Sequence, residues 1–325
     1  MSILRKALLA AGLFCAAASP AAATDLKLLS SWDSSYTVVP LIVDTFIKKV
    51  KESSGGDIAI TMMGPEVVPP FEQVQPVSSG VFDMLFTHGG YHGGESGIGG
   101  ALDAIDGDPV KRRESGVIDF VDAYYQKNFN LKLIAVPSAL TGYQVLLHDK
   151  MKDGRLDGLT IRGTQVYHGL IKKLGGAPVT LPAGEMYSAA ERGVINGIGW
   201  PAVGAVGMKL CEVTPYMVRP SFGVVSYLIF MNLDAFNALT PEQQKIVTEA
   251  GKAVELETVK GFDKILAEED KQMIACGGVM DQQSAEWGAG AQKAFRDQAW
   301  SIAEQTSKDD AKAFRAFALE KGMTK

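Results

Sequence analysis

The stretch LTIRGTQVYHGLIKKLGGAPVTLP, residues 159–182, changes from strand to helix and back to strand composition. Residues 159–163 form a short strand. Residues 165–174 form a helix whose one face carries Val166, Leu170, Ile171 and Leu174. Two glycines end this helix, and residues 178–182 return to strand composition. This order predicts a parallel βαβ unit, in which ligands bind beyond the carboxyl ends of the strands.

The same alternation continues on both sides of this stretch. A helix over 184–193 and a strand over 194–201 follow it, and strands over 26–32, 57–63 and 82–88 precede it. Between the first two strands, an amphipathic helix carries the apolar residues Val39, Ile42, Val43, Phe46, Ile47 and Val50. Because 325 residues exceed one comfortable core, two such halves predict two lobes. Candidate strands over 131–137 and 143–149 connect the lobes.

A long helix is predicted to begin at Pro241. Thr240 is its N-cap and Gln243 completes a capping box. If the helix continues to about Cys276, it is roughly 50 Å long at 1.5 Å per residue, whereas a lobe of this size is roughly 40 Å across. The helix should therefore brace both lobes, although two internal glycines favour a bend.

The first 23 residues have the pattern of a cleaved signal peptide. Arg5 and Lys6 precede the apolar run ALLAAGLFCAAA, and small residues lead to a cleavage site after Ala23. Phe14 before Cys15 argues against lipid attachment. Cleavage lowers the formal charge from −5 to −7, which disfavours nucleic acid or an anionic membrane as a partner.

Patterns for catalysis, cofactors and metals are missing from the sequence. GGESGIGG, residues 93–100, lacks the last glycine of a nucleophile elbow, and no phosphate-binding or dinucleotide-binding motif is found. His88 and His92 are four residues apart, but the glycines between them argue against a helix that presents both to a metal. Cys211 and Cys276 of an exported chain can form a disulfide, but a chain of this size does not need one, so the sequence leaves the pairing open and does not favour it.

Arg162 is the candidate for anion binding. It ends a strand next to Gly163 and a helix N-terminus, where backbone N–H groups favour an anion, and its guanidinium can hold a carboxylate with two parallel hydrogen bonds. The alternative is a surface arginine that reaches solvent or pairs with Asp157. Trp32 and Trp200 also end strands, which places them either at the crevice or in the core.

Several segments together resemble the DctP-type solute-binding proteins of tripartite ATP-independent periplasmic (TRAP) transporters. They are LDGLTIRG (156–163), LGGAPVTLPAGEMYSAAERGVINGIGWP (174–201), PEVVPPFEQVQPVSSGVFDMLFTH (65–88) and the long helix from Pro241. The resemblance covers essentially the whole mature chain. It implies an α/β, periplasmic binding protein-like fold with two lobes joined by crossing strands and a lobe-spanning helix. We expect lobe I to comprise 24–140 plus about 225–265, and lobe II about 141–224 plus 266–325.

The resemblance also implies a function. The chain would be a periplasmic receptor, not an enzyme, that closes on an organic acid and delivers it to the small and large membrane subunits of a TRAP transporter. Arg162 matches the family's carboxylate-gripping arginine. Two alternatives are an exported enzyme on the same scaffold and a binding protein that serves a sensor or another transporter.

Departures from the family pattern bear on the ligand. Asn196 stands where aspartate is usual, and Tyr143 stands where some sugar-acid binders place a second arginine. Gly199 before Trp200 argues against the metal that some 2-oxo-acid binders use. The expected substrate-binding residues are Arg162, Trp200, Tyr143, His88, Tyr91, Trp32, Phe71 and Ala183. One cation among aromatic walls favours a monocarboxylate with an apolar or aromatic body, and we expect no cofactor and no metal.

Overall fold

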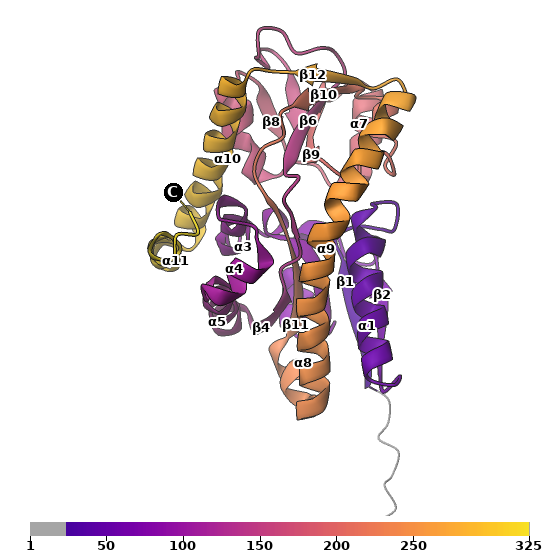
Figure 1. Ribbon diagram of the computed structural model, residues 1–325, viewed down its shortest axis with the longest axis vertical. Helices are drawn as coiled ribbons and strands as arrows, with labels where there is room; N and C mark the ends of the chain where they lie inside the picture. Colours follow the sequence, from indigo (N-terminus) through magenta and orange to yellow (C-terminus); the bar gives the residue numbers. More distant parts are fainter. Residues whose placement is uncertain (1–23, 325) are drawn as a thin grey trace, which may run out of the picture.

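A computed structural model of the chain describes residues 24–324. The predicted signal peptide, 1–23, lies outside the described residues. Two β-sheets, each with its own helices, are stacked along the long axis of the molecule (Figure 1). We call the first sheet with its helices the first lobe and the second sheet with its helices the second lobe. The predicted fold class is confirmed.

The first sheet is parallel at one edge and antiparallel at the other. Its strands are, in spatial order, β2 (Ile58–Met63), β1 (Thr24–Ser30), β3 (Met84–His88), β11 (Val225–Asn232) and β4 (Leu131–Ala135), with β5 (Ser138–Ala139) beside β11. β1 runs parallel to β2 and β3, whereas β11 runs antiparallel to β3 and β4. β11 is buried along its whole length, as the apolar run in its sequence requires.

The second sheet is also mixed. Its order is β12 (Val279–Gln282), β10 (Tyr216–Arg219), β6 (Tyr143–Leu147), β9 (Gly197–Pro201), β7 (Thr160–Arg162) and β8 (Ala177–Val179). β7 is parallel to β8 and β9, as the opening stretch predicts, but β6 is antiparallel to β9 and β10. The parallel pairing expected of βαβ units thus holds for only part of each sheet, because β6 and β11 enter from the other lobe instead of through a crossover helix.

Eleven α-helices cover these sheets within residues 24–324. They are α1 (Thr45–Ser53), α2 (Val74–Ser78), α3 (Ile98–Ala101), α4 (Pro109–Glu114), α5 (Val117–Phe129), α6 (Gln165–Lys173), α7 (Met186–Glu191), α8 (Leu233–Ala238), α9 (Pro241–Ala275), α10 (Ala285–Thr306) and α11 (Lys308–Glu320). The predicted helix after β1 begins as a π-helical turn, η1 (Pro40–Asp44), and continues as α1. No helix among the described residues is long and apolar enough to span a membrane.

The long helix α9 confirms the prediction from its capping box. Thr240 accepts a hydrogen bond from the Gln243 N–H, and the Gln243 side chain accepts from the Thr240 N–H. Its 35 residues run from the first lobe, at the bottom of Figure 1, to the second, at the top. Two buried carboxylates fix it. Glu255 binds Arg113 with two bonds of 2.8 and 2.7 Å in the first lobe, and Glu269 accepts from Gly204 N–H in the second.

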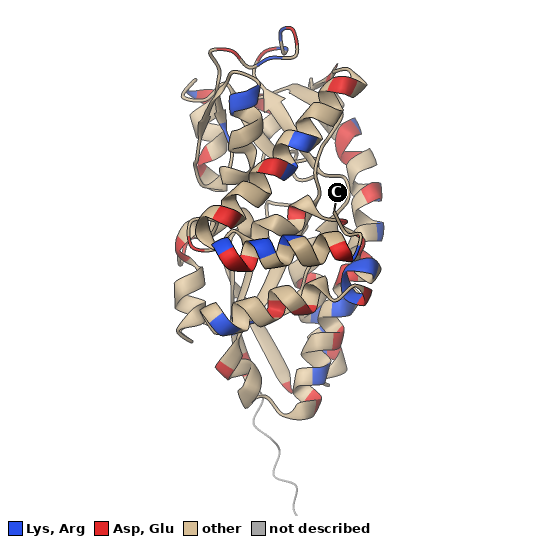
Figure 2. Cartoon of the chain, turned by 90° about the vertical axis from the view of Figure 1, so that its left-hand side faces the viewer, with Lys and Arg blue, Asp and Glu red and all other residues tan. Residues whose placement is uncertain are grey.

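The C-terminal helices make further connections between the lobes. α10 packs against α6 of the second lobe and α3 of the first, and α11 packs against α5. The lobe boundaries stay a prediction, but these contacts argue for grouping α11 with the first lobe instead of with residues 266–306. Acidic and basic residues are interspersed on the helices of this side (Figure 2).

The structure decides the disulfide that the sequence leaves open. Cys211 and Cys276 form a disulfide with a Cα–Cα distance of 6.1 Å. It ties the short helix η6 (Leu210–Glu212) to the C-terminal end of α9. The two cysteines are 65 residues apart in the chain, so only the tertiary structure brings them together.

His92 gives the fold a pH-dependent contribution. Burial, with His88 as a second cause, lowers its pKa to about 3, and its Nε2 lies 2.7 Å from the Tyr125 hydroxyl. The native ring is therefore neutral where an unfolded histidine, with a pKa near 6.5, takes up a proton. Stability from this group is complete above pH 6.5 and falls as the pH falls.

We expect His92→Gln to reduce the loss of stability between pH 7.5 and pH 5 by about 2 kcal/mol relative to the unsubstituted chain. Urea unfolding at the two pH values measures this. His148→Gln is the control, because the His148 side chain is 63% exposed. An equal loss of stability in all three proteins would contradict the assignment.

Candidate functional site

The site lies where strands of both sheets end. β3 ends at His88 and β7 at Arg162, while Trp200 is the next-to-last residue of β9. Trp32 follows the end of β1 by two residues. The crevice between the lobes therefore collects side chains from four strand ends, as the topology rule predicts.

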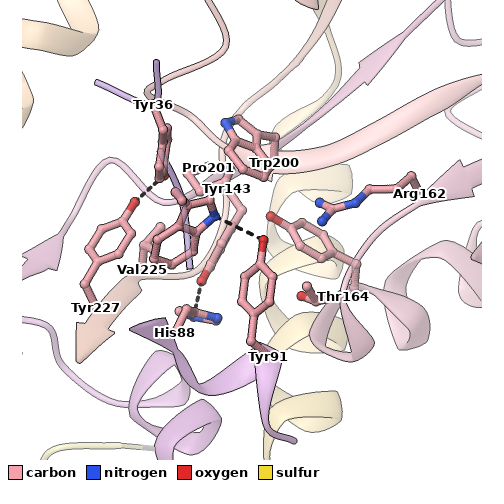
Figure 3. A pocket seen from close by; sticks show the side chains of 12 residues that line it. Tyr36, His88, Tyr91, Tyr143, Arg162, Thr164, Trp200, Pro201, Val225 and Tyr227 are labelled. Atoms are coloured by element: carbon pink, nitrogen blue, oxygen red, sulfur yellow. Dashed lines mark hydrogen bonds between the residues drawn. The ribbon is translucent and has the colours of Figure 1, made fainter. Parts of the chain in front are cut away.

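An inner pocket with about 310 Å³ of space not filled by atoms lies at the centre of this crevice. Figure 3 shows His88 and Arg162 on different sides of it, with Tyr143 beside His88 and Tyr91 between the two sides. It is lined by Trp32, Tyr36, His88, Tyr91, Tyr143, Arg162, Thr164, Tyr167, Trp200, Pro201, Val225 and Tyr227. Both lobes contribute to its wall.

A wider outer pocket shares Trp32 and Tyr36 with the inner one. It has about 890 Å³ of space and also borders residues 65–70 of the first lobe and 182–185 of the second. Ala183 lies here, away from the inner pocket. Phe71 lines neither pocket and instead stacks on Tyr91 at 4.9 Å between ring centroids.

Arg162 is buried, with 1% of its surface exposed. Its Nε and Nη2 donate to the Leu181 carbonyl at 2.9 and 2.7 Å, and Nη1 donates to the Gly199 carbonyl at 3.3 Å. A guanidinium has five N–H groups, so one remains on each terminal nitrogen. Arg162 has no acidic partner among residues 24–324. The alternative pairing with Asp157 is wrong, because Asp157 binds Arg155.

Two further donors near Arg162 lack a protein partner. The Trp200 indole N–H and the Tyr167 hydroxyl are buried and form no hydrogen bond with the described residues. The Arg162 guanidinium carbon lies 5.5 Å from the Trp200 ring. Burial raises the pKa of Tyr167 well above its usual value, while the Arg162 charge opposes that rise. This side of the pocket therefore offers several donors and no carboxylate.

The other side holds a buried polar cluster. The Asp103 carboxylate accepts from His88 Nε2 at 2.8 Å and from the Tyr143 hydroxyl at 2.6 Å through one oxygen. Its second oxygen accepts from the Ser226 N–H at 2.8 Å. Asp103 belongs to the first lobe and Tyr143 to β6 of the second, so this cluster also joins the lobes.

Aromatic rings form the remaining walls. Trp32 packs edge-on against Tyr91 at 5.2 Å and donates its indole N–H to the Tyr91 hydroxyl at 3.0 Å. Tyr36 lies 5.0 Å from the Trp200 ring and 2.6 Å, hydroxyl to hydroxyl, from Tyr227. The rings thus provide a large apolar contact area with few polar atoms. Among the described residues, no three His, Cys, Asp or Glu side chains are grouped to hold a metal ion.

Residues 150–305 match the sequence model of a family described as bacterial extracellular solute-binding protein, family 7, the DctP family. The relatives and the shared architecture agree with this match. The chain belongs to the DctP-type family of TRAP-transporter solute-binding proteins.

The proteins similar to this solute-binding protein include some that are named for, or were solved with, organic acids. The monocarboxylate 2-oxoacid-binding periplasmic protein of Nostoc sp. strain PCC 7120 is 26% identical over 88% of this chain and 80% of its own length. A TRAP solute-binding protein of Bordetella bronchiseptica RB50, solved with calcium and picolinate, has a TM-score of 0.77 and 20% identity over 92% and 93% of the two chains. A marine metagenome TRAP solute-binding protein solved with 3-hydroxybenzoate has a TM-score of 0.76 and 23% identity over 92% of this chain and 97% of its own.

Sequence reasoning found half of the inner pocket. Of the eight expected residues, six line it, whereas Phe71 and Ala183 do not. The residues it missed are Tyr36, Thr164, Tyr167, Pro201, Val225 and Tyr227. Thr164 is the N-cap of α6 and Tyr167 lies in its first turn, both just after Arg162. They could have been expected in the pocket by considering the first turn of the helix as well as the end of the strand. Val225 and Tyr227 come from the crossing strand β11, for which local sequence offers no such signal.

The hydroxyls of Tyr167 and Tyr143 should differ in their effect on stability. Tyr143→Phe removes a donor from the buried Asp103 carboxylate and should lower the free energy of unfolding by about 1.5–3 kcal/mol. Tyr167→Phe removes a hydroxyl without a protein partner and should lower it by no more than about 0.5 kcal/mol. Urea unfolding without added ligand measures both. Equal losses would contradict the hydrogen-bond assignment.

Proposed function

We propose that this solute-binding protein is a periplasmic receptor for a monocarboxylate with an apolar or aromatic body. It holds the acid between its lobes and delivers it to the small and large membrane subunits of a TRAP transporter. The observation that carries the proposal is the buried Arg162 guanidinium, which is held by carbonyl oxygens and has no acidic partner among the described residues.

The donor side of the pocket fits a carboxylate. Backbone carbonyls orient Arg162 and leave one N–H on each terminal nitrogen, which is the arrangement that a two-oxygen acceptor can use. The Trp200 N–H and the Tyr167 hydroxyl add neutral donors. A buried cation with unused donors gains most from an anion that brings its own charge.

The rest of the pocket supports an apolar or aromatic body. Trp32, Tyr36, Tyr91 and Tyr227 surround the inner pocket with rings, which offer an apolar body a large contact area. The relatives named for 2-oxoacids and for an aromatic acid agree with this choice. A sugar acid would leave several hydroxyls against these rings without partners.

The alternative of an exported enzyme has less support. His88 and Asp103 resemble a general-base pair, but Nδ1 of His88 accepts from the Gly90 N–H at 2.9 Å, and Nε2 faces Asp103 and Tyr143. Both ring nitrogens therefore have protein partners, and none of these is a serine or cysteine nucleophile. We assign the cluster to binding and not to catalysis.

Arg162→Ala should weaken binding of the best acid by about 2–5 kcal/mol, or roughly 30-fold and more, because it removes the charge partner from a buried site. Calorimetry with 2-oxoacids, benzoates, dicarboxylates and sugar acids measures the affinities. Arg162→Lys should recover only part of the loss, since an ammonium cannot imitate the planar pair of bonds.

Arg155→Ala is the control, because Arg155 is an exposed arginine near the same strand. Unchanged affinity in Arg162→Ala would overturn the carboxylate assignment. Absence of binding by every acid in the panel would overturn the proposed function as a whole.

Lobe closure gives a second test away from the pocket. A Cβ added at Gly207 of the second lobe would lie 2.2 Å from the Ser35 carbonyl oxygen of the first, a distance that backbone atoms cannot accommodate. We propose that ligand binding requires this close approach. Gly207→Ala should then weaken binding about tenfold or more by disfavouring the closed arrangement.

Gly184→Ala is the matched control, because a Cβ there meets no atom within 4 Å although Gly184 borders the outer pocket. Calorimetry gives the affinity, and small-angle scattering with saturating ligand gives the radius of gyration, which should be larger for Gly207→Ala. Identical affinity and scattering in both variants would contradict closure at this contact.

A further inference from the structure

The side of the inner pocket away from Arg162 is formed by a buried cluster of His88, Asp103 and Tyr143, here called the Asp103 cluster. Their exposed fractions are 5%, 1% and 2%. His88 and Tyr143 line the pocket, and Asp103 lies directly behind them, bonded to both. Figure 3 places His88 on the opposite side of the pocket from Arg162.

We propose that Asp103 is a specificity-determining residue that excludes a second negative charge from the ligand. It acts through His88 and Tyr143, so that the far end of the pocket accepts neutral groups, above all hydrogen-bond donors, and rejects carboxylates. The inference rests on the proposed function, because it presumes that the first carboxylate is held by Arg162.

The hydrogen bonds indicate that Asp103 is an ionised acceptor. Both of its oxygens face donors, namely His88 Nε2, the Tyr143 hydroxyl and the Ser226 N–H. A protonated carboxyl would need an acceptor for its own proton, whereas an ionised one is acceptor-only and suits three donors. A full negative charge therefore lies one side chain away from the ligand space.

The protons of the cluster point away from the ligand space. The Gly90 N–H donates to Nδ1 of His88, which leaves the ring proton on Nε2, facing Asp103. The Tyr143 hydroxyl also directs its proton to Asp103. The Tyr143 oxygen also lies 2.9 Å from His88 Nε2, so what the cluster can still offer a ligand is the remaining lone pair of that oxygen. Such a surface can accept from a ligand hydroxyl or amide but has no donor for an anion.

A nearby arginine, Arg112, offsets part of this charge without binding the carboxylate. Arg112 is buried and donates to Ser138, Ser226 and two backbone carbonyls, but not to the Asp103 carboxylate. Arg112 does not line the inner pocket. The charge on Asp103 is felt at the pocket wall: after burial, the main cause, it raises the pKa of Tyr143 and contributes to raising those of Tyr167 and Tyr227.

The pocket consequently has a positive side at Arg162 and a negative side at Asp103. A monocarboxylate gains from both, because its charge meets Arg162 and its body meets a surface free of anions. A dicarboxylate of matching length must place its second charge near Asp103 in a site of low dielectric constant, where like charges repel strongly.

Matched pairs of ligands test the inference at pH 7.5. Each pair joins a diacid to its monoamide, which has nearly the same shape but a single charge: succinate and succinamate, glutarate and glutaramate, adipate and adipamate, and terephthalate and 4-carbamoylbenzoate. Calorimetry should show the best-bound monoamide binding more than about 100-fold tighter than its diacid.

Asp103→Asn removes the charge with little change of shape and should reduce that ratio at least tenfold. Asp106→Asn is the control, since Asp106 lies on the same segment but binds Lys111 outside the inner pocket. If Asp103→Asn fails to fold, it is combined with His88→Phe. The second substitution removes the His88 Nε2–H, which would otherwise face the NH2 group of the introduced amide, and the same ratio is measured.

Three results would overturn the inference while leaving the proposed function intact. They are a diacid that binds within threefold of its monoamide, a ratio that persists in the folded Asp103 variant, and binding of simple monocarboxylates with rejection of every monoamide. The proposed function itself fails if neither the monoamides nor benzoate, pyruvate and 2-oxobutyrate bind.

Discussion

Burying the Arg162 guanidinium removes it from water, and the protein compensates with carbonyl oxygens and an indole ring, not with a carboxylate. Leu181 and Gly199 supply those oxygens from the ends of neighbouring chain segments, and the Trp200 ring lies alongside. The compensation is incomplete, because carbonyl dipoles do not balance a full charge. In the proposed function a carboxylate completes it, so the cost of burying the charge favours binding of acidic solutes.

Such a site requires that the two lobes hold a fixed position relative to each other. The helix α9 contributes to this, because it is bound to both lobes. Glu255 binds the first lobe through Arg113 and the Val136 N–H, and Glu269 binds the second through the Gly204 N–H. Phe262, between them, stacks on Tyr227 of the pocket wall. One rigid helix thus carries an anchor for each lobe and a contact to the site, while the disulfide secures its far end.

The pocket has charged groups of opposite sign on its two sides, and in the proposed function this asymmetry allows a small number of polar residues to select the ligand. Arg162 supplies attraction at one side, and Asp103, behind His88 and Tyr143, supplies repulsion at the other. Rings fill the space between. Attraction alone would admit every small acid, whereas a fixed anion discriminates against those that carry a second charge.

Much of the fold could be predicted from local sequence. The βαβ unit around Arg162 follows from helical spacing and terminal glycines, and α9 follows from a capping box, since both signals act within a few residues. The antiparallel positions of β6 and β11 could not be predicted in this way, because strand direction depends on which lobe the chain comes from. The disulfide could not be decided for the same reason, since 65 residues separate its cysteines.

The sequence by itself determined the class of protein and the residue that the site is built around: two α/β lobes, a bracing helix and an arginine at a strand end. Only the tertiary structure decided what surrounds Arg162. Asp157, three residues before β7, pairs with Arg155 and not with Arg162. Asp103, 59 positions from Arg162 in the chain, lies behind His88 and Tyr143 on the other side of the pocket. Charges act through space and not along the chain, so the electrostatics of a pocket exist only once distant strand ends have been brought together.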